Sequence, residues 1–165
     1  MEKVIINISI KELYEEYSED IFRYSYSILK KYEEARDIVQ EVFLHHIENE
    51  KSFKGECSYK TWLFIITRNL CYSRLRSKSF NNDNIENHIV KKNYIETYDI
   101  NISIRDALMK ISNENSELLY LKEYEGYSYL EISQITNLSV ENIAVKLYRT
   151  KKLLRKYLKD FKEYK

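Results

Sequence analysis

Proline is absent from the 165-residue chain, and glycine occurs only twice, at positions 55 and 126. These two residue types supply the tight turns that β-sandwiches, barrels and phosphate-binding loops need. Their scarcity excludes those architectures and predicts an all-α protein. The apolar share of 44%, the charged share of 32% and the 16 tyrosines suffice for a packed core and are unlike a disordered chain.

Cysteine and long apolar runs are also scarce. Cys57 and Cys71 can build neither a zinc site nor a disulfide framework by themselves, which favours a reducing cytoplasm. The three histidines have no metal-ligand spacing, so we expect no metal and no cofactor. No run approaches the roughly 18 apolar residues of a membrane span, and residues 4–10 are too short and polar for a signal sequence. We therefore expect a cytoplasmic protein without membrane contact of its own.

Motifs of catalysis are missing as well. The chain has no glycine-rich phosphate loop, no G-x-S-x-G and no H-E-x-x-H. Its many carboxylates fall on helix faces without an evident catalytic partner. We therefore expect a protein that is not an enzyme.

Charge is nearly balanced, with 27 basic and 26 acidic side chains and a net charge of +1. The balance hides an uneven distribution along the chain. Residues 1–50 carry a net charge of −6, whereas residues 51–80 and 139–165 each carry +6. Two separate basic segments are typical of a protein that contacts a polyanion at two places and another partner through its acidic surface. Either segment taken singly could equally be a solvated helix face.

Apolar spacing and a capping pair predict three helices in the first half. Ser9 and Glu12 form a capping box ahead of a helix at about 10–31, and a second helix at 33–48 turns Ile38, Val42 and Ile47 inward. After a loop at 49–58, a third helix at 59–77 is first apolar and then basic. The asparagine-rich stretch after it lacks apolar periodicity and is the best linker candidate.

Four further patterns predict helices in the second half. Ser103 and Asp106 are expected to cap a helix to residue 111, and another helix spans 114–124. The Ser128–Glu131 capping box opens a helix to residue 136, and a long helix follows at 140–159.

The last two helices form a helix-turn-helix pattern. Asn137 tolerates the left-handed conformation that the turn 137–139 requires, and Ser139 is a natural N-cap for the long helix. Such a second helix enters the major groove, where Asn142 could pair with adenine, and Lys146 or Arg149 with guanine or phosphate. The pattern favours DNA binding, although any helical hairpin shares it.

Two blocks of residues resemble a known family. Residues 37–76 match the pattern D-hydrophobic-VQE-x-F, then F-x-G, then TWL-x-x-I-x-x-N with basic residues after it, which resembles region 2 of bacterial extracytoplasmic-function (ECF) sigma factors. The stretch from Leu108 to Leu158 resembles region 4 of the same family. The resemblance implies two small helical domains, region 2 at 1–78 and region 4 at 103–165, joined by a flexible linker at 79–102.

The resemblance also implies roles for particular residues. The face that docks on core RNA polymerase would be formed by Asp37, Gln40 and Glu41. The surface that melts and holds the minus-ten element of promoter DNA would be formed by Lys54, Tyr59, Lys60, Trp62, Arg68, Asn69, Arg74 and Arg76. Aromatic faces for unstacked bases and cations for the backbone suit that task. Helical spacing nevertheless favours the core for Trp62, so Tyr59 is the better stacking candidate.

Region 4 would read the minus-thirty-five element through the long helix. Its candidate residues are Ser139, Glu141, Asn142, Val145, Lys146, Arg149 and Lys152. Where the family often has lysine and serine early in this helix, the chain has Ala144 and Val145, so the promoter sequence that it reads cannot be borrowed from the family. An anti-sigma factor is a further expected partner, because such proteins often hold sigma factors inactive.

Two other functions stay open from the sequence. A stand-alone helix-turn-helix regulator would bind duplex DNA by itself and use its first half to dimerise. A protein-binding helical adaptor is a weaker alternative, since two basic segments argue against it. Free binding to a palindromic duplex would favour the stand-alone regulator, whereas dependence on core polymerase would favour the sigma factor.

Overall fold

The computed structural model describes residues 9–49, 53–80 and 102–162, and every regular element in these ranges is a helix. The prediction of an all-α protein is therefore confirmed. In chain order the helices are α1 (Ile10–Leu29), α2 (Tyr32–Glu48), α3 (Tyr59–Phe80), α4 (Ile102–Lys110), α5 (Asn113–Leu119), the π-helical turn η2 (Tyr120–Tyr124), α6 (Tyr129–Thr136) and α7 (Val140–Lys162). The predicted linker at 79–102 falls almost wholly outside the described residues.

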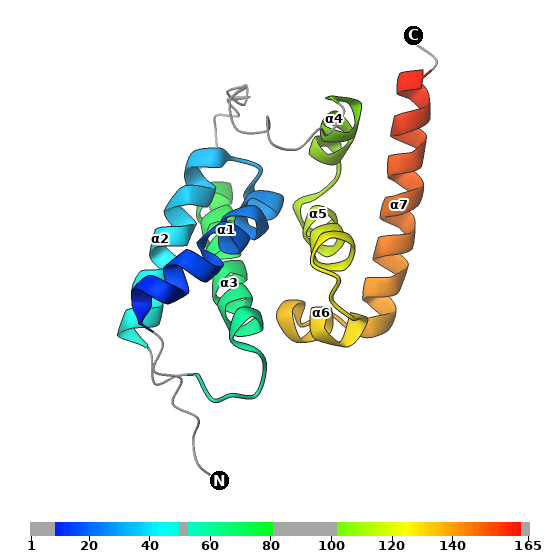
Figure 1. Cartoon of the computed structure of the whole chain (residues 1–165). Helices are drawn as coiled ribbons and strands as arrows, with labels where there is room; N and C mark the ends of the chain where they lie inside the picture. The colour runs from blue at the N-terminus through cyan, green and yellow to red at the C-terminus, as the bar shows by residue number, and fades with distance from the viewer. Residues whose placement is uncertain (1–8, 50–52, 81–101, 163–165) are drawn as a thin grey trace.

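Helices α1, α2 and α3 pack together as the first half of the molecule (Figure 1). The predicted capping box opens α1, because the Ser9 hydroxyl accepts from the Glu12 amide while the Glu12 carboxylate accepts from the Ser9 amide. The helix ends earlier than predicted, at Lys30, whose φ of 56° is left-handed. A turn of this kind reverses the chain into α2 without a glycine.

One prediction for α2 is wrong. Ile38 and Val42 are buried as expected, but Ile47 is 58% exposed and His46 is buried in its place. Successive residues of a helix are 100° apart, so His46, four positions after Val42, continues the buried row, whereas Ile47 has already turned outward. An apolar side chain in the last turn was a misleading signal.

The second half consists of α4 to α7. The helix predicted at 114–124 begins one residue earlier, at Asn113 behind the N-cap Ser112, and its last turn is the π-helical η2, where the Glu125 amide donates to the Tyr120 carbonyl. Gly126 then takes a φ of 75°, which ends the segment. The cap predicted at Ser103 is wrong, because α4 already begins at Ile102.

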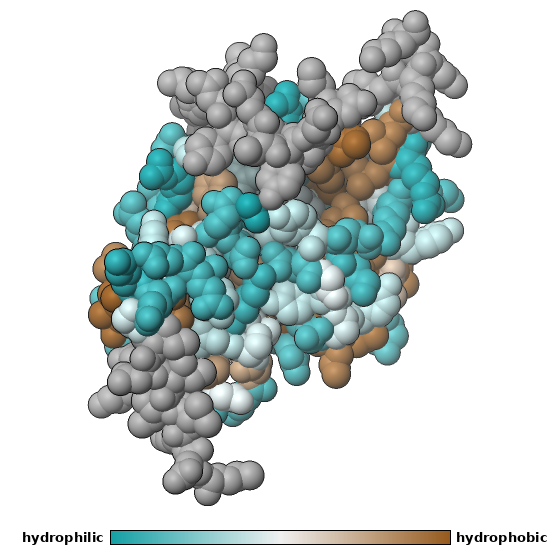
Figure 2. Space-filling model, viewed as in Figure 1, coloured by the Kyte–Doolittle hydropathy of each residue, from teal (hydrophilic) through white to brown (hydrophobic). Residues whose placement is uncertain are grey.

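The two halves share one core. Helices α1 and α3 contact α5, η2 and α6, and the Tyr24 ring of α1 stacks on Phe64 of α3 and on Tyr120 of η2, with centroids 4.4 and 5.8 Å apart. On the face seen in Figure 2 hydrophobic surface appears beside α4 and α7, whose exposed apolar side chains include Ile104, Met109 and Leu153. Across the three described ranges, no helix combines the length and hydropathy of a bilayer crossing.

Candidate nucleic-acid interface

The predicted helix-turn-helix is confirmed in its geometry. Asn137 ends α6 with a left-handed φ of 58°, and its amide donates to the Ser133 carbonyl at 2.8 Å. The Ser139 hydroxyl then accepts from the Asn142 amide at 3.2 Å and so caps the start of α7. Ser139 therefore has a structural task, and any contact of its hydroxyl with DNA would compete with the cap.

Helix α7 has one buried side and one outward side. Ile143, Leu147 and Thr150 face the core. The outward side carries Glu141, Asn142, Val145, Tyr148, Arg149 and Lys152, all exposed. Five of the seven residues predicted to read the minus-thirty-five element therefore share one exposed face. Tyr148 was not among the predicted residues, although its place three positions after Val145 could have indicated it, and it is 67% exposed.

Lys146 lies apart from that face. Its ammonium is 2.7 Å from a carboxylate oxygen of Glu114 at the start of α5, and the side chain is half-buried. The neighbouring Lys151 is paired with Glu123 of η2 at 2.6 Å. Both lysines thus hold α7 against the rest of the second half, whereas Arg149 is exposed to solvent.

The start of α3 lies in an aromatic cluster. Tyr59 and Trp62 meet each other and the rings of Phe53 and His46, with centroid distances between 5.2 and 5.7 Å. The Tyr59 hydroxyl is also 2.9 Å from Nδ1 of His46. Both candidate rings are half-buried, so the structure places Tyr59 deeper than its expected position at the loop edge. Sequence spacing alone did not reveal the contacts of Phe53 and His46 with these rings.

The basic residues of α3 fall into two groups. Asn69 and Arg76 are exposed, as is Lys54 in the preceding loop. Lys60, Arg68 and Arg74 instead have carboxylate partners within the molecule. The predicted minus-ten surface is therefore only partly open in this conformation.

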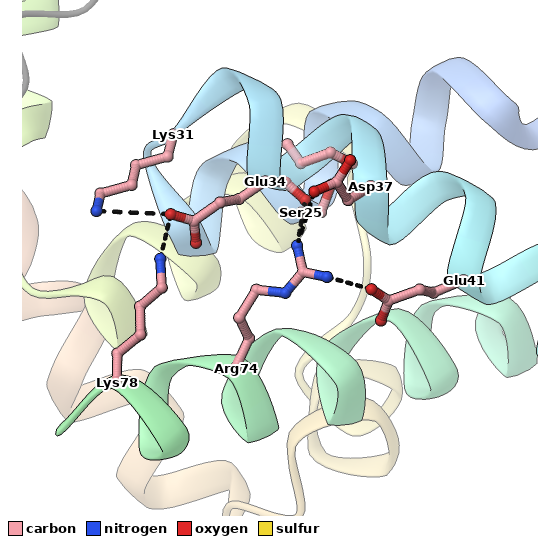
Figure 3. A network of polar contacts seen from close by, with 8 residues as sticks. Ser25, Lys31, Glu34, Asp37, Glu41, Arg74 and Lys78 are labelled. Carbon is pink, nitrogen blue, oxygen red and sulfur yellow. Dashed lines mark hydrogen bonds and ion pairs between the residues drawn. The ribbon is translucent and has the colours of Figure 1, made fainter. Parts of the chain in front are cut away.

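Arg74 joins α3 to the candidate polymerase face on α2 (Figure 3). Its guanidinium donates to the Glu34 carbonyl and contacts the carboxylates of Asp37, at 3.6 Å, and Glu41. Asp37, Gln40 and Glu41 lie on the side of α2 away from its buried residues, and Asp37 and Gln40 are exposed. Leu44 continues this side and is 59% exposed, and it was not among the predicted residues.

Arg68 meets a buried carboxylate of the second half. Its Nε donates to Glu117 at 2.9 Å, and the hydroxyls of Tyr24 and Tyr72 donate to the two oxygens of the same carboxylate at 2.7 Å. The Glu117 side chain is fully buried. Desolvation raises the pKa of Glu117, while Arg68 and the two hydroxyls act in the opposite direction.

Lys60 meets carboxylates from both halves. Its ammonium is 2.7 Å from Asp20 and 2.6 Å from Glu125, and the Tyr120 hydroxyl donates to the other oxygen of Glu125 at 2.7 Å. Desolvation acts to lower the pKa of Lys60, but the hydrogen bonds and charges of the two carboxylates outweigh it and raise the pKa. The raised pKa keeps Lys60 charged, and carboxylates engage both Lys60 and Arg68.

None of the described residues form a group of three or more histidine, cysteine or acidic side chains that could hold a metal ion. The arrangement is instead that of binding surfaces: a helix-turn-helix with an exposed polar and basic face, an aromatic cluster beside basic residues, and an acidic face on α2.

Comparisons with known proteins match both halves. The family model for sigma-70 region 2 matches residues 13–80, and that for sigma-70 region 4 matches residues 101–154. Curated relatives match along most of their length. The ECF RNA polymerase sigma factor SigM of Bacillus subtilis is 27% identical over 158 residues, covering 90% of this chain and 94% of the relative. SigW of the same species is 24% identical over 160 residues, covering 87% and 86%.

Two solved structures share the fold. One is the sigma factor RpoE of Bartonella quintana in complex with the anti-sigma factor NepR, with a TM-score of 0.72, 22% identity, and coverage of 90% of this chain and 96% of that one. The other is CnrH in complex with the cytosolic domain of CnrY, with a TM-score of 0.65, 16% identity, and coverage of 92% and 88%.

Proposed function

The chain belongs to the ECF group of RNA polymerase sigma factors, and from this we propose how its surfaces divide the work of an alternative sigma factor that directs promoter-specific transcription. The first half binds core RNA polymerase and the minus-ten element, and the second half binds the minus-thirty-five element. The single observation that carries this proposal is the match of both regions, in order, over residues 13–80 and 101–154. A stand-alone helix-turn-helix regulator has no need of region 2.

The polymerase contact is assigned to the exposed side of α2. Asp37, Gln40 and Glu41 present two carboxylates and an amide there, and the exposed apolar side chain of Leu44 follows them on the same side of the helix. Arg74 contacts both carboxylates and so restricts their conformations before binding, which reduces the entropy lost on association. A partner surface with cations beside an apolar patch would complement this face.

The minus-thirty-five contact is assigned to the outward side of α7, and the minus-ten contact to the aromatic cluster and basic residues of α3. The protein supplies no chemistry of its own in this scheme, since strand opening draws on the free energy of base stacking and phosphate contacts. We place the protein in the cytoplasm with core polymerase. We also propose an anti-sigma partner, because a sigma factor of the same fold was solved in complex with an anti-sigma factor.

The polymerase assignment is tested by affinity capture on core RNA polymerase. The variant Asp37→Ala, Gln40→Ala, Glu41→Ala is expected to bind at least about tenfold more weakly, because an interface loses its central polar contacts. The matched control is Glu15→Ala, Glu16→Ala. It also removes two negative charges, but from an exposed part of α1, and it should bind core polymerase normally.

Alanine at Asp37 and Glu41 also removes two carboxylate partners of Arg74, so thermal unfolding is followed for each variant. The single variant Gln40→Ala leaves those ion pairs intact and should still weaken binding. Unchanged capture of the triple and single variants would contradict the assignment, as would an equal loss in the control.

A further inference from the structure

The outward side of α7 carries two neighbouring apolar side chains. Val145 and Tyr148 are three positions apart on this side, and they are 46% and 67% exposed. Helix α7 lies along one edge of the molecule, at the right of Figure 1. Single exposed apolar residues are common on protein surfaces, but a pair on the DNA-facing side of a helix-turn-helix indicates an apolar contact in the complex.

Polar residues adjoin this apolar pair along the helix. Asn142 lies three positions before Val145 and Arg149 four positions after it, and both are exposed. Seven residues of an α-helix rise about 10 Å, which is roughly three base-pair steps of about 3.4 Å. The outward side can therefore read neighbouring base pairs in one groove, with the apolar pair at the centre.

The one lysine of this stretch is turned away from that centre. Lys146 follows Val145 in the sequence, but its ammonium is 2.7 Å from a carboxylate oxygen of Glu114. No other basic residue occurs within 140–148. The start of α7 therefore offers bases polar and apolar groups without a cation, and the first exposed cation is Arg149.

The major groove of DNA displays one kind of apolar group, the C5-methyl group of thymine. The other base edges present hydrogen-bond donors and acceptors, which an apolar side chain cannot satisfy. Resting on the minus-thirty-five contact proposed above, we propose that Val145 and Tyr148 determine promoter specificity by packing against thymine methyl groups. Asn142 then pairs with adenine on one side of them, and Arg149 with guanine or phosphate on the other.

The proposal defines the class of promoter that the protein reads. Its minus-thirty-five element carries thymine at the centre, on one strand or the other. Serine or lysine, which the ECF group often has where this chain has Ala144 and Val145, would offer no comparable apolar surface. A promoter sequence borrowed from the group would therefore miss this contact.

The test removes single methyl groups from DNA. The full chain is combined with core RNA polymerase to give the holoenzyme, which selects binding sequences from promoter duplexes randomised at the minus-thirty-five element. Each thymine of the selected element is then replaced by deoxyuridine, which lacks only the C5-methyl group and still pairs with adenine. The methyl ratio is the dissociation constant with deoxyuridine divided by that with thymine. At one or two positions it should be about 4, the value for one buried methyl group.

Variants assign the methyl contact to its residues. Val145→Ser and Tyr148→Ala should each bring the methyl ratio at one of these positions close to 1, because the apolar surface is withdrawn. Tyr148→Phe keeps the ring and should keep the ratio. The matched control Lys156→Ala changes an exposed side chain of α7 two turns beyond Arg149 and should also keep it. The ratio compares two DNAs with the same protein, so a general loss of affinity cancels.

The outcomes separate this inference from the proposed function. A selected element without thymine, or methyl ratios near 1 at every thymine in the wild type, would overturn the inference and leave the proposed function standing. A ratio that stays at about 4 in both Val145→Ser and Tyr148→Ala would also overturn it, since another group would then contact the methyl. A holoenzyme that selects no minus-thirty-five sequence would instead contradict the assignment of α7 to that element, on which the inference rests.

Discussion

At the scale of single residues, neighbouring positions on one helix have different tasks. Lys146 and Arg149 are both basic and three positions apart, and the sequence offers either as a base contact. Burial separates them: Lys146 is drawn toward Glu114, whereas Arg149 lies among the exposed residues of the outward side of α7. The sequence could not distinguish them, because the partner of Lys146 is 32 positions away.

Arg149→Ala should therefore damage promoter recognition more than Lys146→Ala. Loss of a base contact costs about 1–3 kcal/mol of discrimination, and loss of a phosphate contact mainly lowers the salt dependence of binding. Lys146→Ala removes a partly exposed ion pair, worth about 0–1 kcal/mol of stability. Reconstituted transcription and DNA affinity over a range of salt concentrations measure the difference. An equal loss from a folded Lys146→Ala protein would show that Lys146 also reaches DNA, contrary to this prediction.

At the scale of elements, most local signals were reliable, and the misses fall where a motif was incomplete or where packing decided the structure. The capping boxes at Ser9 and Ser128 and the left-handed Asn137 were predicted, because each motif needs only residues three or four positions apart. Ser112 and Ser58 cap α5 and α3 in the same way but were missed, since neither is followed by glutamate at the third position. The π-helical turn and the buried His46 depend on packing, which spacing does not encode.

Ser128→Ala should lower the free energy of unfolding by about 1 kcal/mol, because the first turn of α6 loses its cap. Ser73→Ala, at an exposed position inside α3, is the matched control and should be neutral or slightly stabilising. Urea unfolding followed by circular dichroism at pH 7 provides both values. A loss no larger than that of the control would contradict a stabilising cap.

The same capping box predicts a pH dependence. Hydrogen bonds from the Ser128 hydroxyl and amide lower the pKa of Glu131 below its ordinary value of 4.5. A lowered pKa in the folded state means that the stabilisation is complete above pH 4.5 and is lost as the pH falls through the lowered value. The stability difference between wild type and Glu131→Gln should therefore shrink on acidification. A difference that stays constant from about pH 7 to about pH 3 would argue against this coupling.

At the scale of the whole molecule, the sequence predicted two halves but did not predict that they pack against each other. Charge blocks and motifs divide the chain, yet the contact joins Tyr24 to Glu117, 93 positions apart, and no periodicity spans that distance. Part of the charge cancellation is also spatial, because acidic residues of the second half lie against basic residues of the first. Contacts between the halves engage two of the candidate site residues, Lys60 and Arg68, which the sequence placed on an open surface.

Because Tyr24, Phe64 and Tyr120 form one core across the halves, the free protein should unfold in a single transition. Trp62 fluorescence, which reports on the first half, and circular dichroism, which reports on all the helices, should give the same urea midpoint. Two separated midpoints would show that the halves are energetically independent.

The aromatic cluster has a spectroscopic consequence. Trp62 is the only tryptophan of the chain, and its ring lies 5.7 Å from His46 and 5.5 Å from Tyr59, beside the residues assigned to the melted promoter strand. Emission excited at the red edge of the indole band therefore originates from one known place. Binding of a melted promoter strand to the proposed minus-ten surface should therefore change this emission, and the kinetics of strand capture could then be followed without attaching a dye to the protein.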